Sequence, residues 1–150
     1  MKLKPLLGLQ LKDPQIVELL DVFDVDVVYS FDRDFENQPD RYSASAFSEG
    51  LELQFDERQR LVTIFVYVRG YGDFKPHDCL GLDLERFSTI EDACEFVTKN
   101  DLPHKLNIQN PKVPVWIRID YPDCSVHYQF GAEGLGMITL MDPKTVPGAD

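Results

Sequence analysis

Hydrophobic and polar positions recur with two different periods along this chain, and these periods separate helices from strands. Downstream of Asp13, apolar residues follow the three- and four-residue spacing of one helix face. Asp13 suits an N-cap and Pro14 the first helical position, where its missing N–H is not needed. The same spacing recurs over residues 90–97, after a capping box formed by Ser88 and Glu91. The pattern predicts helices that begin at these two caps.

Six segments alternate apolar and polar residues with the period of two that is typical of half-buried strands. They are residues 41–46, 49–55, 61–68, 113–121, 124–130 and 136–141. Short turns connect them in two groups of three, so consecutive strands are expected to pair antiparallel. Residues 25–31 fit either a short extra strand or the exit from the first helix.

The two halves of the chain also resemble each other at an offset of 75 residues. The Gln-Phe pair at 54–55 is repeated at 129–130, and the two helix starts have the same offset. Self-similarity at a fixed offset indicates repeats. We therefore expect an α+β fold of two tandem repeats, each a helix plus an antiparallel meander, with the helices packed on one face of the sheet. The repeats would span about 13–70 and 88–143 within a single domain, 1–150.

The composition of the chain bears on its binding partners more than on its fold. The 43% hydrophobic and 27% charged fractions are ordinary for a globular protein, but the formal net charge of −11 is not. Nucleic acid and anionic membranes would be repelled by this charge, so neither is expected as a partner. A basic protein is the partner class that the charge favours.

Cysteines and the N-terminus predict a cytoplasmic location. Cys79, Cys94 and Cys124 are odd in number and form no CxxC pair, which favours reduced thiols over disulfides or zinc. The apolar run near the N-terminus is too short for a secretory signal. No stretch reaches the eighteen or so apolar residues of a membrane span.

Candidate catalytic and metal motifs are weak. The run His77-Asp78-Cys79 suggests a Cys–His pair, but adjacent residues rarely face each other as a catalytic pair does. Carboxylates at alternate positions in 32–36 could suit a hard cation, yet the sixth and twelfth positions of a calcium loop starting there hold Asn37 and Ser43. We expect no enzyme activity, catalytic residue, metal or cofactor. A small hydrolase using His77 or the acidic cluster of residues 21–40 is the least favoured alternative.

Charge is concentrated between residues 21 and 40, where seven acids face one base, Arg33. Aromatic residues lie among these acids, so the segment combines attraction for a basic protein with residues suited to buried contacts. A solvated loop whose aromatic residues pack inward is the alternative. The predicted partner-binding residues are Asp24, Asp26, Tyr29, Asp32, Asp34, Phe35, Glu36 and Asp40.

Three features resemble a known class of proteins: the Asp-Pro helix start, the strand Gly-Leu-Glu-Leu-Gln-Phe-Asp at 50–56, and Leu-Val-Thr-Ile-Phe-Val-Tyr at 61–67. They resemble the immunity proteins of contact-dependent inhibition and type VI secretion, which are encoded beside bacterial polymorphic toxins. The tandem layout is similar to the beta-lactamase-inhibitor-protein-like fold. The resemblance implies an inhibitor of a cognate toxin, with acids mimicking phosphate if the toxin is a basic nuclease. The alternative is a non-enzymatic interaction or regulatory module that self-associates through a sheet edge.

Overall fold

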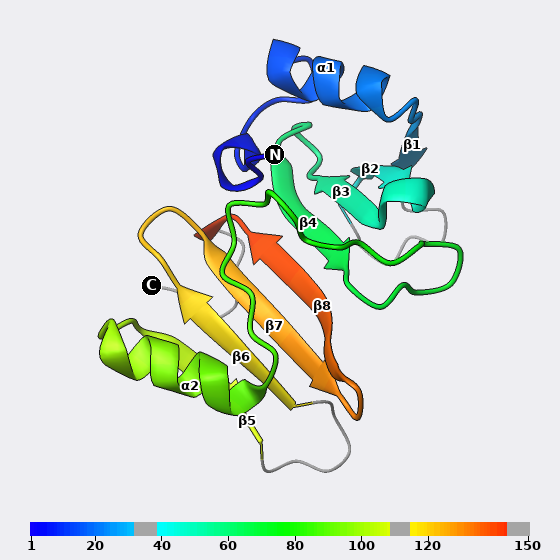
Figure 1. Ribbon diagram of the computed structural model, residues 1–150. Helices are drawn as coiled ribbons and strands as arrows, with labels where there is room; N and C mark the ends of the chain where they lie inside the picture. Colours follow the sequence, from blue (N-terminus) through cyan, green and yellow to red (C-terminus); the bar gives the residue numbers. More distant parts are fainter. Residues whose placement is uncertain (32–38, 109–114, 144–150) are drawn as a thin grey trace.

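The computed structural model describes residues 1–31, 39–108 and 115–143. Within these ranges the chain forms one eight-stranded antiparallel sheet in the order β1-β2-β3-β4-β8-β7-β6-β5 (Figure 1). The strands are β1 (Val27–Ser30), β2 (Arg41–Ala46), β3 (Leu51–Phe55), β4 (Leu61–Tyr67), β5 (His104–Asn107), β6 (Val115–Asp120), β7 (Ser125–Gly131) and β8 (Gly134–Met141). The helices are α1 (Pro14–Val22), α2 (Ile90–Lys99) and the short 3-10 turns η1 (Lys4–Leu6) and η2 (Phe47–Glu49).

The expected architecture of two tandem helix-plus-meander repeats is wrong. Strands make up 39% of the structure and helices 20%, and the strands belong to one sheet. Its two halves are joined because β4 pairs with β8, from Thr63↔Met141 to Tyr67↔Met137. Separate meanders would each leave an open strand edge at this point, and pairing removes both edges.

The first helix begins as predicted and the second begins one residue later. The Asp13 carboxylate accepts a hydrogen bond from the Gln15 N–H at 2.9 Å, with Pro14 in the first turn. The cap of α2 is Thr89, whose hydroxyl accepts a hydrogen bond from the Asp92 N–H at 3.2 Å. The predicted capping box at Ser88 is therefore wrong. Both hydroxyl residues are followed three positions later by an acid, so the sequence pattern fits either of them.

A single hydrophobic core forms between the sheet and the elements on one of its faces. The two α-helices and the segment 68–89 lie on that face (Figure 1). Helix α1 contributes Ile16 and α2 contributes Val97, which are 0% and 1% exposed and pack with inward-facing strand residues such as Ile64 and Ile138. Burying these side chains on one face is the main force that holds helices to sheet.

The six predicted strands are present as β2, β3, β4, β6, β7 and β8, with ends shifted by two residues or fewer where the structure describes them. The segment 25–31, left open by the sequence, contains β1. Strand β5 has no counterpart among the predicted strands. The two strands that the pattern did not assign are the two edges of the sheet.

Candidate functional site

Four of the predicted partner-binding residues come together at the β1 edge of the sheet. Asp24 and Asp26 precede β1, Tyr29 lies in it, and Asp40 lies immediately before β2. The other four, Asp32, Asp34, Phe35 and Glu36, lie outside the described residues. We define the β1 edge as the following residues: Asp24, Asp26, Val28, Tyr29, Phe31 and Asp40.

A tight reversal after α1 brings this segment to the sheet. The Val25 N–H donates to the Leu20 carbonyl at 3.0 Å, and the Asp24 N–H donates to the Asp21 carbonyl at 3.1 Å. Asp24 has a φ of +51°, a left-handed conformation that Asp adopts more readily than most residues. The reversal leaves Asp24 and Asp26 exposed before the strand begins.

Pairing with β2 then fixes β1 in register, from Val27↔Ala44 to Ser30↔Arg41. Val27 is half-buried and packs against the core, whereas the remaining three residues of the strand are exposed. β1 is the first strand of the sheet, and β2 is its partner among the described strands. Its outer backbone groups therefore face away from the sheet, where an added strand of another protein could pair with them.

Two exposed aromatic side chains lie at this edge, Tyr29 within β1 and Phe31 just after it. The ring centroid of Tyr29 lies 5.8 Å from that of Phe31 in a stacked arrangement and 5.0 Å from that of Tyr42. Tyr29 is 47% exposed, Phe31 51% and Val28 59%. Rings held by neighbouring rings lose little conformational entropy on binding, which makes them suitable anchors in an interface.

A hydrogen bond connects the aromatic and acidic parts of the β1 edge. The Tyr29 hydroxyl donates to Asp40 Oδ2 at 2.6 Å. This bond raises the pKa of Tyr29 to about 12, so the phenol keeps its proton well into the alkaline range. Residues 21–31 contain three acids and no base, and Arg41 lies opposite Ser30 on β2. The edge therefore combines negative charge, apolar area and open backbone groups.

Val28 and Phe31 belong to this surface but were not among the predicted site residues. Phe31 is one of the aromatic residues that lie among the acids of residues 21–40. Alternation along a strand would have placed Tyr29 and Phe31 on the same side. That signal becomes available only once 25–31 is assigned as a strand.

The His77–Cys79 segment does not form an activated thiol pair. His77 Nδ1 accepts a hydrogen bond from the Cys79 backbone N–H at 2.8 Å, so this nitrogen is already engaged by the backbone. Burial raises the pKa of the Cys79 thiol and lowers the pKa of His77. Both shifts disfavour a thiolate–imidazolium pair. In the described ranges, no three His, Cys, Asp or Glu side chains are grouped so that they could hold a metal ion.

A second aromatic cluster lies where β4 ends. The Phe74 ring centroid is 4.6 Å from that of Phe47 and 4.4 Å from that of Tyr67, and Tyr71 stacks on Tyr67 at 5.8 Å. Tyr71 is 72% exposed and lines a hollow of about 440 Å³. This cluster lacks an open strand, because β4 is paired on both sides. It offers apolar area without the backbone groups of the β1 edge.

No family model matches the chain, and no curated protein or solved structure was found to match it. None of the helices among the described residues is long and apolar enough to cross a membrane.

Proposed function

We propose that this protein binds and neutralises a basic protein toxin, and that the β1 edge is its binding surface. The observation that carries the proposal is the exposed, stacked pair Tyr29 and Phe31 at an edge strand flanked by Asp24 and Asp26. The resemblance of the Asp-Pro helix start and of residues 50–56 and 61–67 to immunity proteins supports the same function.

Binding would proceed in two stages on this surface. The acids first attract the basic partner and raise the association rate. Tyr29 and Phe31 then become buried in the partner, while the outer backbone of β1 pairs with one of its strands. A nuclease toxin must present basic residues to hold phosphate, so the same negative edge that attracts it also covers its substrate site. The inhibitor would act in the cytoplasm, before the toxin reaches nucleic acid.

The first test is to identify the toxin from the neighbouring gene and to measure whether this protein protects cells that express it. We expect the gene for this protein to lie beside a gene for a large secreted protein with a basic C-terminal domain. Cells expressing that domain should survive when the wild-type protein is co-expressed and die when it carries Tyr29→Ala and Phe31→Ala. Death with the wild-type protein, or equal survival with the double variant present at the same level, would contradict the proposal.

Self-association is a second candidate function, and the charges of the two sheet edges favour it. β1 is preceded by Asp24 and Asp26 with no base beside them, whereas β5 contains Lys105 and is preceded by Asp101. One copy could therefore pair its β1 with β5 of another, head to tail. Light scattering over a range of concentrations separates the two functions. A mass that grows with concentration supports self-association, and a constant monomer mass excludes it.

A further inference from the structure

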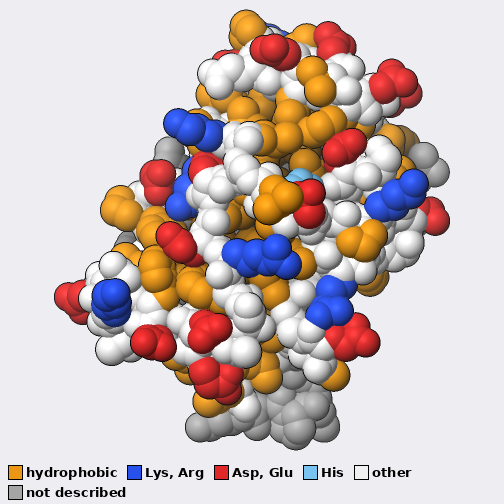
Figure 2. Space-filling view, viewed as in Figure 1, with side chains coloured by type: hydrophobic (Ala, Val, Ile, Leu, Met, Phe, Trp, Pro, Cys, Tyr) orange, Lys and Arg blue, Asp and Glu red, His pale blue; other side chains and the backbone are white. Residues whose placement is uncertain are grey.

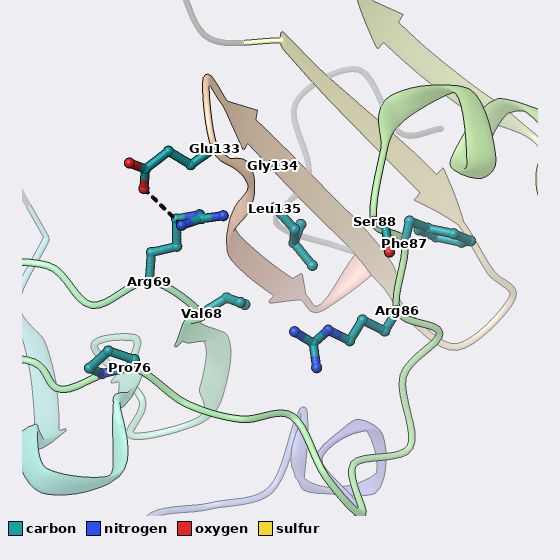
Figure 3. Close-up of a pocket in the computed structure, with 9 residues that line it drawn as sticks. All are labelled: Val68, Arg69, Pro76, Arg86, Phe87, Ser88, Glu133, Gly134 and Leu135. Atoms are coloured by element: carbon teal, nitrogen blue, oxygen red, sulfur yellow. Dashed lines mark hydrogen bonds and ion pairs between the residues drawn. The ribbon is translucent and has the colours of Figure 1, made fainter.

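A cavity of about 540 Å³ lies where three segments distant in the sequence converge (Figure 3). They are the end of β4 with its exit, the stretch that leads into α2, and the turn between β7 and β8. The lining residues used in the argument are Val68, Arg69, Arg86, Phe87, Glu133 and Leu135. The volume falls within the range of about 300–1,000 Å³ that is common for small-molecule sites.

Two arginine side chains reach this space from different segments. Arg69 and Arg86 approach it from opposite sides in Figure 3. Arg69 Nη1 forms an ion pair with Glu133 Oε2 at 2.8 Å, and both side chains are largely exposed, at 45% and 78%. Arg86 Nη1 donates a hydrogen bond to the Asp78 backbone carbonyl at 3.1 Å, and this bond fixes the position of the guanidinium. Over residues 1–31, 39–108 and 115–143, no carboxylate forms an ion pair with Arg86.

The hairpin turn beside the Arg69 side chain requires a glycine. Gly134 has a φ of +103°, and a Cβ added there would lie 3.4 Å from the Ser88 carbonyl oxygen and 3.6 Å from Arg69 Nη2. These are ordinary van der Waals distances, so space does not exclude a side chain here. The backbone conformation does, because L residues rarely adopt this positive φ, and glycine therefore fixes the turn beside Arg69.

The cavity departs from the charge of the protein as a whole. Arg69 and Arg86 against Glu133 leave a local charge of +1 in a protein of −11. On the face shown in Figure 2, Lys and Arg side chains are scattered among Asp and Glu side chains. A monoanion balances a single positive charge, whereas a dianion such as phosphate would retain excess negative charge beside Glu133. Guanidinium groups match the two oxygens of a carboxylate, and Val68 and Leu135 line the cavity beside them. The Phe87 ring points away from the arginines in Figure 3 and packs on Phe96 and Tyr128 in the core.

We propose that this cavity binds a carboxylate attached to a small apolar group, held by Arg69 and Arg86. The carboxylate lies between the guanidiniums and competes with Glu133 for Arg69. Its source is either a free organic acid or the C-terminus of a peptide, because the two share the recognised chemistry. The proposal does not depend on the β1 edge or on toxin binding.

The test is an NMR titration of the full chain that follows the Arg69 and Arg86 side-chain resonances. The probes are benzoate, the peptide acetyl-Ala-Leu with a free C-terminus, the same peptide amidated, and inorganic phosphate. Saturable shifts with benzoate identify a site for free acids. Tighter binding of the peptide, lost on amidation, identifies a C-terminus site. Absence of saturable binding by either carboxylate, or tighter binding of phosphate than of both, overturns the proposal.

Matched variants distinguish binding by the two cavity arginines from a general effect of the protein's net charge. Arg86→Gln and Arg69→Gln should each weaken carboxylate binding about tenfold, the usual effect of losing a hydrogen bond to a charged group. Arg58→Gln removes the same charge from the exposed β3–β4 turn and should change the affinity less than twofold, because that charge is screened. Glu133→Gln should tighten binding about threefold by removing the competitor. Equal weakening by Arg58→Gln and Arg86→Gln, or weaker binding with Glu133→Gln, contradicts the assigned geometry.

Discussion

The two edges of the sheet offer a partner the same backbone but different side chains. β1 and β5 are each four residues long, each pairs with one neighbouring strand, and each exposes three of its residues. β1 is flanked by Asp24 and Asp26, and stacked aromatic rings lie within it and just after it. β5 contains Lys105 and Leu106, and one acid, Asp101, precedes it. An open edge alone therefore does not identify a binding surface, and its side chains decide which partner it accepts.

Distance makes the two edges electrostatically independent. Seven spacings of about 4.8 Å separate the first strand from the eighth, or roughly 34 Å across an untwisted sheet. This is about four times the screening length of roughly 8 Å at physiological salt. A partner docked at β1 therefore responds to Asp24 and Asp26 and is almost insensitive to Lys105.

The largest expected effect comes from removing the aromatic anchors. Tyr29→Ala with Phe31→Ala should weaken binding of the basic partner by about 30-fold or more, because one buried aromatic anchor contributes about 2 kcal/mol. The matched control is Leu106→Ala with Ile108→Ala at the β5 edge, where the side chains are 39% and 54% exposed. Isothermal titration calorimetry measures both affinities, and thermal unfolding verifies that both variants fold.

The control should bind within about threefold of the wild type, as near-neutral positions do. Equal losses of affinity in the two double variants would mean that the β1 and β5 edges contribute equally to partner binding. A loss of affinity confined to the β5 double variant would show that the partner binds at the β5 edge instead.

Neutralising the acids should have a smaller effect, mainly on kinetics. Asp24→Asn with Asp26→Asn should slow association about three- to tenfold and reduce its salt dependence, because surface charges act on the encounter. Asn is the suitable replacement at position 24, since it also tolerates the left-handed backbone. Stopped-flow measurements at two salt concentrations give both quantities.

Glu57→Gln with Glu95→Gln removes the same net charge from exposed positions elsewhere and serves as the control. If it slows association as much as the aspartate variant does, total charge rather than the β1 edge attracts the partner. If the aspartate variant aggregates while its association rate is unchanged, the acids protect an open edge and do not bind.

Reversing the charge of the other edge should have almost no effect. Lys105→Glu lies beyond the screening length from β1, so we expect the partner's affinity to change less than about twofold. The same substitution should abolish any concentration-dependent growth in mass, because head-to-tail pairing needs this charge. A larger change in partner affinity would place the partner near β5.

The smallest expected effect is the loss of stability at alkaline pH as the Tyr29 hydroxyl ionises. The pKa of Tyr29 is about 12 in the folded protein because Asp40 accepts its proton in a hydrogen bond, against about 10 for a free tyrosine. Between about pH 10 and pH 12, the Tyr29 hydroxyl loses its proton in the unfolded chain and keeps it in the folded chain. The contribution to stability is therefore complete below about pH 10 and is lost as pH rises towards 12.

Tyrosinate absorbance measured for the wild type minus Tyr29→Phe should show this phenol ionising near pH 12. Asp40→Asn should move the ionisation down towards about 10. Tyr29→Phe keeps the ring and should bind the partner within about threefold of the wild type. A loss as large as that of the double alanine variant would show that the hydroxyl, rather than the ring, makes the contact.

The inner strands could be predicted from the sequence, but the two edges and the central junction could not. β3 alternates buried and half-buried positions along Leu51–Phe55, because one face of an inner strand meets the core. Of the residues in β1 and in β5, only Val27 and Asn107 are even half-buried, so no alternation marks these strands. The β4–β8 pairing joins residues about 75 positions apart, which local patterns do not encode.

The residues of the proposed surface could be anticipated only in part. Clustered charge identified Asp24, Asp26 and Asp40 without any knowledge of the fold. Val28 and Phe31 could be recognised only when β1 was known to be an edge strand. Charge is visible in the sequence, whereas exposure of an apolar residue depends on which strand covers it.

The most direct test of the β1 edge is amide hydrogen exchange in the free protein and in its complex with the basic partner. Strand addition at β1 predicts slower exchange of amides within residues 27–31 in the complex, with unchanged exchange over residues 104–108. Slower exchange at β5 or around Tyr71, with residues 27–31 unaffected, would contradict the account.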